Sequence, residues 1–100
     1  MEFLNKVEIK GIVGYVAINK VSDKSITNLS LVTETCANSN GALTIEVTWF
    51  NCVAFMELEI AKGDKVHVIG RIRTRRYTDQ DDNERVSMDV VVQSLEKIED

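Results

Sequence analysis

Three arginines and a tyrosine alternate along one short stretch of the chain, at Arg71, Arg73, Arg75 and Tyr77. In a β-strand, side chains two residues apart point to the same face, so this spacing predicts one face that carries the guanidinium groups and the phenol ring. A guanidinium can donate paired hydrogen bonds to a phosphate, and an aromatic ring can stack on any nucleobase. The sequence offers these arginines no obvious acidic partner except in the turn that follows. We therefore interpret the face as a nucleic-acid-binding surface in preference to an ordinary solvated charged strand.

A second candidate surface lies in the stretch from Val47 to Phe55, where large aromatic residues alternate with smaller ones. Residues of one parity would fill the interior of a barrel, and those of the other parity would form an exposed stacking strip. The expected interior set is Thr48, Phe50, Cys52 and Ala54, and the expected exposed set is Val47, Trp49, Asn51, Val53 and Phe55. The alternative for Trp49 is a place in the core. If exposed, Trp49, Phe55 and Tyr77 would each contribute about 1–3 kcal/mol per stacked base, whatever the base.

Strands are the elements that must position these residues, because apolar, β-branched and aromatic side chains recur along the chain with a period of two. We predict five strands, at residues 7–16, 26–35, 43–55, 65–77 and 85–95, with turns at 19–24, 37–41 and 79–83. Gly11 and Gly14 predict a bulge or a sharp bend in the first strand. Residues 56–62 have room for only a short helix, which Gly63 would end. Strands in this number, with a short helix between the third and fourth, follow the order of the OB-fold, an all-β Greek-key barrel.

Length and composition indicate a single domain. One hundred residues with 44% hydrophobic side chains can form one core, so we assign residues 1–100 to one domain with its core at about 5–95. No apolar stretch approaches the roughly 20 residues needed to cross a bilayer, and the N-terminus carries no secretory pattern. We expect a cytoplasmic protein without a membrane partner, whose two cysteines, Cys36 and Cys52, remain free thiols.

A catalytic function is the first alternative, and its candidate residues are few. Cys36 or Cys52 could act with the lone histidine, His67, or two of the aspartates at 79, 81 and 82 could act together. Neither set lies in a catalytic or metal-binding motif, and the aspartates are typical of a solvated hairpin tip. We therefore expect no enzyme activity, no cofactor and no metal site.

The charge distribution bears on the remaining interpretations. The net charge is −4, yet four of the twelve basic residues lie within positions 71–76, while acids gather at 79–84 and at the C-terminus. A local basic stretch suits phosphate contacts, whereas the overall acidity favours an OB-fold module that binds protein or RNA, as in a primosome or the translation apparatus. Weak salt dependence would favour that alternative, because binding a single strand releases about 0.7 counterions per phosphate contact.

Five blocks of residues in this order carry a family resemblance: Asn5-Lys6-Val7 with Gly11 and Gly14, Asn28-Leu29-Ser30-Leu31, Thr48-Trp49-Phe50-Asn51-Cys52-Val53-Ala54-Phe55, Lys62-Gly63-Asp64-Lys65-Val66, and Gly70-Arg71-Ile72-Arg73-Thr74-Arg75-Arg76-Tyr77-Thr78-Asp79. Together they cover most of residues 5–92, and the end of the last block is the most specific. In type and order they resemble the OB-fold domain of the bacterial single-stranded-DNA-binding proteins.

The resemblance implies a protein that binds and protects single-stranded DNA without reading its sequence, during replication, recombination and repair. It also implies a homotetramer, with a dimer as the alternative, in the bacterial cytoplasm in association with the nucleoid. By position, Trp49, Phe55 and Tyr77 correspond to stacking aromatics, Arg73 and Arg75 to residues that contact the DNA backbone, and Lys6 to a basic N-terminal position. Arg71 joins this set through its shared strand face.

Several features depart from the family pattern. No aromatic residue stands near Cys36 and Ala37, where the family often has one, and Phe50 stands where it commonly has a histidine. The connection at 56–62 is shorter than the family's usual helix. The chain ends at Asp100 without a Gly- and Pro-rich linker and acidic tip. Partner enzymes recruited through such a tail are therefore not expected, whether this is a tailless relative or one domain of a longer protein.

Overall fold

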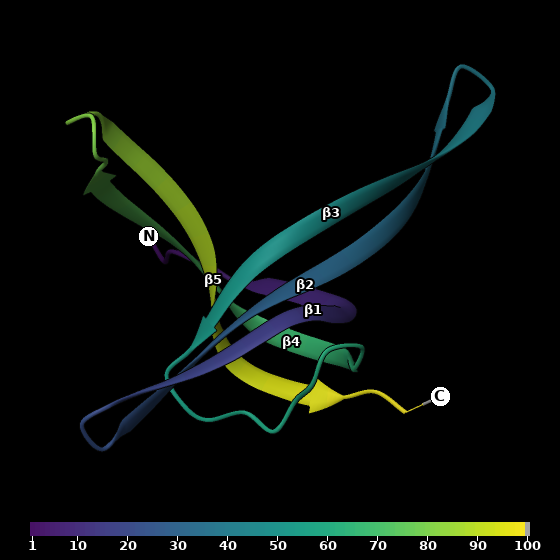
Figure 1. The fold of residues 1–100 in the computed structure, drawn as a ribbon. Coiled ribbons are helices and arrows are strands. Elements are labelled where there is room, and N and C mark those ends of the chain that lie inside the picture. The colour runs from purple at the N-terminus through teal and green to yellow at the C-terminus, as the bar shows by residue number, and fades with distance from the viewer. Residues whose placement is uncertain (100) are drawn as a thin grey trace.

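Five long β-strands close into a barrel in the computed structural model, which describes residues 1–99 (Figure 1). The strands are β1 (Val7–Val21), β2 (Lys24–Ser39), β3 (Ala42–Ala54), β4 (Lys65–Thr78) and β5 (Glu84–Lys97). Around the barrel the order is β1-β2-β3-β5-β4, and β4 closes onto β1. The β3–β5 contact is parallel and the other neighbours are antiparallel. This topology confirms the predicted all-β OB barrel.

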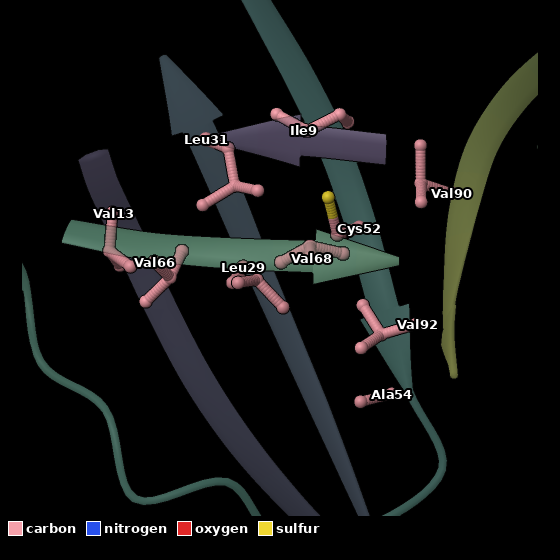
Figure 2. Packing of buried hydrophobic residues seen from close by; sticks show 10 residues of the cluster. All are labelled: Ile9, Val13, Leu29, Leu31, Cys52, Ala54, Val66, Val68, Val90 and Val92. Atoms are coloured by element: carbon pink, nitrogen blue, oxygen red, sulfur yellow. The ribbon is translucent and has the colours of Figure 1, made fainter. Parts of the chain in front are cut away.

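The core lies where the inner faces of all five strands meet (Figure 2). Its buried members are two residues apart on β2, β3, β4 and β5 and four apart on β1, so within each strand they share the face that alternation turns inward. They are Ile9, Val13, Leu29, Leu31, Cys52, Ala54, Val66, Val68, Val90 and Val92. Cys52 and Ala54 therefore fill the interior as predicted, and Phe50 packs partly buried against them. Thr48, by contrast, is exposed, because β3 has left the barrel at that point.

The connection between β3 and β4 differs from the prediction, because residues 56–62 form no helix. Thr27, buried on β2, donates a hydrogen bond to the Met56 carbonyl at 2.7 Å and accepts one from the Leu58 N–H at 3.2 Å. Leu58 and Ile60 both pack against the core, at a spacing of two that suits an extended chain. A segment this short cannot offset the cost of helix nucleation, so these tertiary contacts decide its shape. Within residues 1–99, no helix is long and apolar enough to span a membrane.

Three strand pairs, β1–β2, β2–β3 and β4–β5, continue beyond the barrel and project in different directions (Figure 1), and the last two concern the candidate site. We call the outer pairing of residues 33–39 with 42–48 the β2–β3 arm, and that of 73–78 with 84–89 the β4–β5 arm. In the first, pairing extends to Ser39 and Ala42, although the polar residues there predicted a loop.

Candidate functional site

The alternating arginines of β4 lie on one face of the β4–β5 arm and its base. The register pairs Arg73 with Asp89, Arg75 with Ser87 and Tyr77 with Arg85. Directly opposed residues of an antiparallel pair share a face, so β5 adds Arg85 to the predicted set. The opposite face of the same arm carries the exposed apolar side chains of Val86 and Met88. On β5, Arg85 thus lies on the arginine face and Val86 and Met88 lie on the other, where Arg76 and Thr74 of β4 are opposite them.

Asp89 is an acidic partner that the sequence analysis did not anticipate, and the expectation that the arginines lack one is wrong. Arg73 Nε donates to Asp89 Oδ1 at 3.1 Å, and Arg73 Nη2 donates to Oδ2 at 2.9 Å. Arg75 Nη2 approaches the same Oδ2 at 3.2 Å. The hydrogen bonds from Arg73 hold the pKa of Asp89 below its usual range and raise the pKa of Arg73. Two of the three predicted arginines are therefore already partnered.

The turn that ends this arm is fixed by Asp79. Its Oδ1 accepts hydrogen bonds from the N–H groups of Asp81 and Asn83, both at 2.9 Å, and its Oδ2 accepts one from Arg85 Nε at 2.8 Å. The Arg85 bond, followed by the Asn83 bond, lowers the pKa of Asp79. The clustered aspartates thus belong to a hairpin turn, and Arg85 is tied to it.

Trp49 is exposed, at 59% of its surface, so its alternative placement in the core is wrong. Its ring lies against Gly14 of β1, where a Cβ would stand 2.9 Å from Trp49 Cη2 and 3.2 Å from Ser30 Oγ. The β1–β2 register shifts between Val13 and Tyr15, which confirms a bulge at Gly14. A residue without a side chain is required here because the indole occupies the space that a Cβ would take.

Phe55 follows β3 and is 55% exposed. The Arg73 guanidinium lies over its ring, with Cζ 5.6 Å from the ring centroid. Such a cation–π contact holds the ring and the guanidinium together. Val53 departs from the predicted exposed strip, because β3 pairs there with both Asn28 on β2 and Val91 on β5, and the valine is buried.

Two hollows connect the tryptophan with the arginine face. One, of about 230 Å³, is lined by Val7, Trp49, Phe50, Asn51, Ile72, Met88, Asp89 and Val90. The other, of about 250 Å³, is lined by Tyr15, Asn28, Leu29, Ser30, Asn51, Cys52, Val53, Arg75, Ser87, Met88 and Asp89. Asn51, Met88 and Asp89 belong to both, so Trp49 and Arg75 stand on adjoining hollows. Tyr15, an exposed aromatic that the sequence analysis missed, follows the Gly14 bulge and could have been found from that position.

Lys6 precedes β1 beside the base of the arginine face. Val7 pairs with Gly70. The Asn5 side chain accepts a hydrogen bond from the Ile72 N–H at Oδ1 (3.0 Å) and donates one from Nδ2 to the Ile72 carbonyl (2.7 Å). This register places exposed Lys6 next to Arg71, which is also exposed. The predicted basic residues are thus brought together on β4 and beside the start of β1.

The residues considered for catalysis are dispersed. Cys36 and Cys52 are free, as predicted, with Cys36 on the β2–β3 arm and Cys52 in the core. Burial, with a smaller contribution from Asp89, raises the pKa of Cys52 to about 12, so it stays a thiol at neutral pH. His67 Nε2 pairs with Glu8 Oε2 at 2.9 Å across β1 and β4. No metal-binding group of His, Cys, Asp and Glu side chains occurs among residues 1–99.

Comparison with known proteins gives concordant results. Residues 4–98 match the profile of the Single-strand binding protein family. The chain is 35% identical over 103 residues to a single-stranded DNA-binding protein of Rhizobium meliloti (strain 1021), covering 92% of this chain and 59% of that relative. The chain thus spans somewhat over half the length of this curated relative.

Two solved structures share the fold. A Plasmodium falciparum SSB in complex with ssDNA superimposes with a TM-score of 0.90 at 18% identity, covering 99% of this chain and 98% of that one. A small single-stranded DNA-binding protein from Streptomyces coelicolor gives a TM-score of 0.70 at 19% identity, covering 93% of each chain. At these identities, the two likenesses establish the barrel topology.

Proposed function

The chain belongs to the single-strand binding protein family, and from this premise we propose that it binds single-stranded DNA without reading base sequence. The observation that carries the proposal is the exposed Trp49 ring. It lines a hollow that adjoins the hollow lined by Arg75. Rings provide stacking surfaces for bases, and guanidinium groups provide partners for phosphates. The two kinds of group together match the alternating chemistry of a nucleic-acid strand.

Each predicted side chain has a proposed role in this binding. Trp49, Phe55 and Tyr77, all more than half exposed, stack on bases. Arg71, Arg73, Arg75 and Lys6 supply the positive charge along the DNA backbone. Stacking and phosphate contacts are both tolerant of sequence, because every base has a π-face and every nucleotide has a phosphate. The basic path is local, so it is compatible with a net charge of −4.

The wider role follows from the family as a proposal. The protein coats and protects single-stranded DNA during replication, recombination and repair, in the bacterial cytoplasm at the nucleoid. It does so as a single domain of residues 1–100, through binding alone and without catalysis, and as a homo-oligomer, either tetramer or dimer. An OB-fold module for protein or RNA, the competing interpretation, is not favoured by the family assignment.

Quenching of the single tryptophan tests the proposal directly. An oligothymidylate of about 16 nucleotides, at the upper end of the site size of one OB-fold, is titrated into the protein at about 50 and about 200 mM salt. We expect strong quenching at the lower salt and weaker binding at the higher salt, because stacking reports on Trp49 and counterion release reports on the arginines. Absence of any fluorescence change at low salt would count against DNA binding at this surface.

A further inference from the structure

Arg73 differs from its neighbours in how its guanidinium is held. Its Nε and Nη2 both donate to Asp89, at 3.1 and 2.9 Å, in the fork geometry that fixes the plane of the group. The face of the same guanidinium lies over the Phe55 ring, 5.6 Å from its centroid. Asp89 is therefore joined through Arg73 to an exposed aromatic residue that comes from another part of the barrel.

Solvent exposure increases from Asp89 to Arg73 to Arg75. The Asp89 side chain is 9% exposed and that of Arg73 is 26% exposed, whereas that of Arg75 is 59% exposed. Arg75 reaches the same carboxylate through one nitrogen, at 3.2 Å, so most of its five N–H donors remain directed elsewhere. Arg73 is thus the enclosed member of the pair, and Arg75 is the member able to turn toward a phosphate.

A base that stacks on Phe55 needs a ring whose orientation is set before the base arrives. A ring at the end of β3 with half of its surface in solvent has little packing of its own to set that orientation. The guanidinium, itself fixed by a largely buried carboxylate, supplies a planar surface against one side of the ring. Phe55 still keeps 55% of its surface exposed, so a base can reach the ring.

We propose that Arg73 is a positioning residue, which Asp89 holds in place and which orients Phe55 for base stacking, while Arg75 and Arg71 contact phosphates. The proposal rests on the DNA-binding function proposed above. It assigns a part to Asp89, whose charge is opposite to what a DNA-binding surface needs. It also separates Arg73 from Arg75, although the two residues look equivalent in the alternating sequence.

The sign of the effect of Asp89→Asn distinguishes positioning from charge. Asn removes a negative charge beside the DNA path, so electrostatics alone predicts tighter binding of an oligothymidylate. Loss of the carboxylate fork frees Arg73 and Phe55, so the proposal predicts binding weakened by roughly fivefold to tenfold, within the range of one stacked base. Affinity is measured by anisotropy of a labelled oligothymidylate of about 16 nucleotides, at a temperature where thermal melts show the variant folded.

Lysine replacements at the two arginines provide the matched comparison. Arg73→Lys keeps the charge but loses the planar fork, so we expect it to bind more weakly than the wild type with an unchanged salt dependence. Arg75→Lys keeps a phosphate contact and should bind nearly as well as the wild type, while Arg75→Ala should lower the slope of log affinity against log salt by about 0.7. A double-mutant cycle with Phe55→Leu should show that Arg73→Lys costs little once the ring is gone.

The outcomes distinguish a failure of DNA binding from a failure of the positioning role of Arg73. Failure of the wild type to bind the oligothymidylate would overturn both the DNA-binding proposal and the role of Arg73. Binding by the wild type, together with tighter binding by Asp89→Asn or with fully additive effects of Arg73→Lys and Phe55→Leu, would overturn the positioning role alone. Weaker binding by folded Asp89→Asn with a non-additive cycle supports it, because a residue that only stabilises the fold would leave the affinity of the folded protein unchanged.

Discussion

The β2–β3 arm and the β4–β5 arm are both antiparallel strand pairs, but different side-chain contacts hold them. The β4–β5 arm is crossed by charged contacts, from Arg73 and Arg75 to Asp89 near its base and from Arg85 to Asp79 at its turn. In the β2–β3 arm the strands are paired along their length, and Leu43, Ile45 and Val47 are exposed on one face. Threonine side chains of that arm donate to backbone carbonyls, as Thr44 Oγ1 does to Ala37 at 3.1 Å.

This difference shows that exposed strands can be kept in shape by two means. Where charged groups must stand at fixed positions, ion pairs add specific side-chain geometry to the backbone ladder. In the β2–β3 arm, which presents an apolar face, the backbone ladder is supported by β-branched residues and by threonine hydrogen bonds to backbone carbonyls. Substitutions in the two arms should therefore differ in their consequences, and the following predictions run from the largest expected effect to the smallest.

Asp89→Ala should be the most damaging change, because it leaves Arg73 without the carboxylate that compensates for its partial burial. Breaking a buried ion pair costs about 3–5 kcal/mol, and we expect about 3 kcal/mol here because Arg73 retains contact with water. Urea unfolding followed by circular dichroism measures the loss. A change within about 0.5 kcal/mol would mean that the charged contacts do not hold the β4–β5 arm.

The stability difference between the wild type and Asp89→Ala should depend on pH, and this dependence serves as a control. The pKa of Asp89 is lowered in the folded state from its ordinary value of 3.8, so its contribution to stability is present above that pH. It is lost as the pH falls through the folded pKa. The difference in stability between the wild type and Asp89→Ala should therefore narrow as the pH is lowered below about 3.8. A difference that stays constant on acidification would contradict an origin in the ionised carboxylate.

Trp49→Ala, at the base of the β2–β3 arm, should weaken binding of a labelled oligothymidylate by about 1–3 kcal/mol. Its thermal unfolding should change little, because the ring is mostly exposed and lies outside the barrel core. Leu43→Ala is the matched control, since Leu43 is exposed on the same arm and lines neither hollow. A large drop in melting temperature for Trp49→Ala would assign the ring a role in folding instead.

Ile45→Thr should have the smallest effect, a change in unfolding free energy within about 0.5 kcal/mol. Ile45 is exposed, and threonine keeps the branched side chain that suits a strand. Val86→Thr makes the equivalent change on the face of the β4–β5 arm that carries Val86 and Met88, and urea unfolding compares the two. If Ile45→Thr were the more destabilising by more than 1 kcal/mol, the apolar face of the β2–β3 arm would have to be packed against something in solution.

The strand pattern of the sequence was sufficient to predict the barrel and the shared face of the arginines, because both predictions rest on the alternation of side chains within single strands. The pattern was not sufficient where the environment of a residue is set by contacts with another strand. Asp89 is found only by counting outward from the 79–83 turn, which pairs it with Arg73. The shape of residues 56–62 depends on Thr27, far away in the sequence, and the position of the Trp49 ring depends on the space that Gly14 leaves on β1.

The packing of the Trp49 ring against Gly14 has a consequence for the conformational entropy of binding. Immobilising one side chain on binding costs about 0.5–1.5 kcal/mol when that side chain is free to rotate beforehand. The indole already rests against the β1 backbone, with Ser30 close to the same point, so its rotamers are restricted in the unbound protein. Much of that ordering cost is therefore incurred when the chain folds, and an arriving base meets a ring that is already oriented.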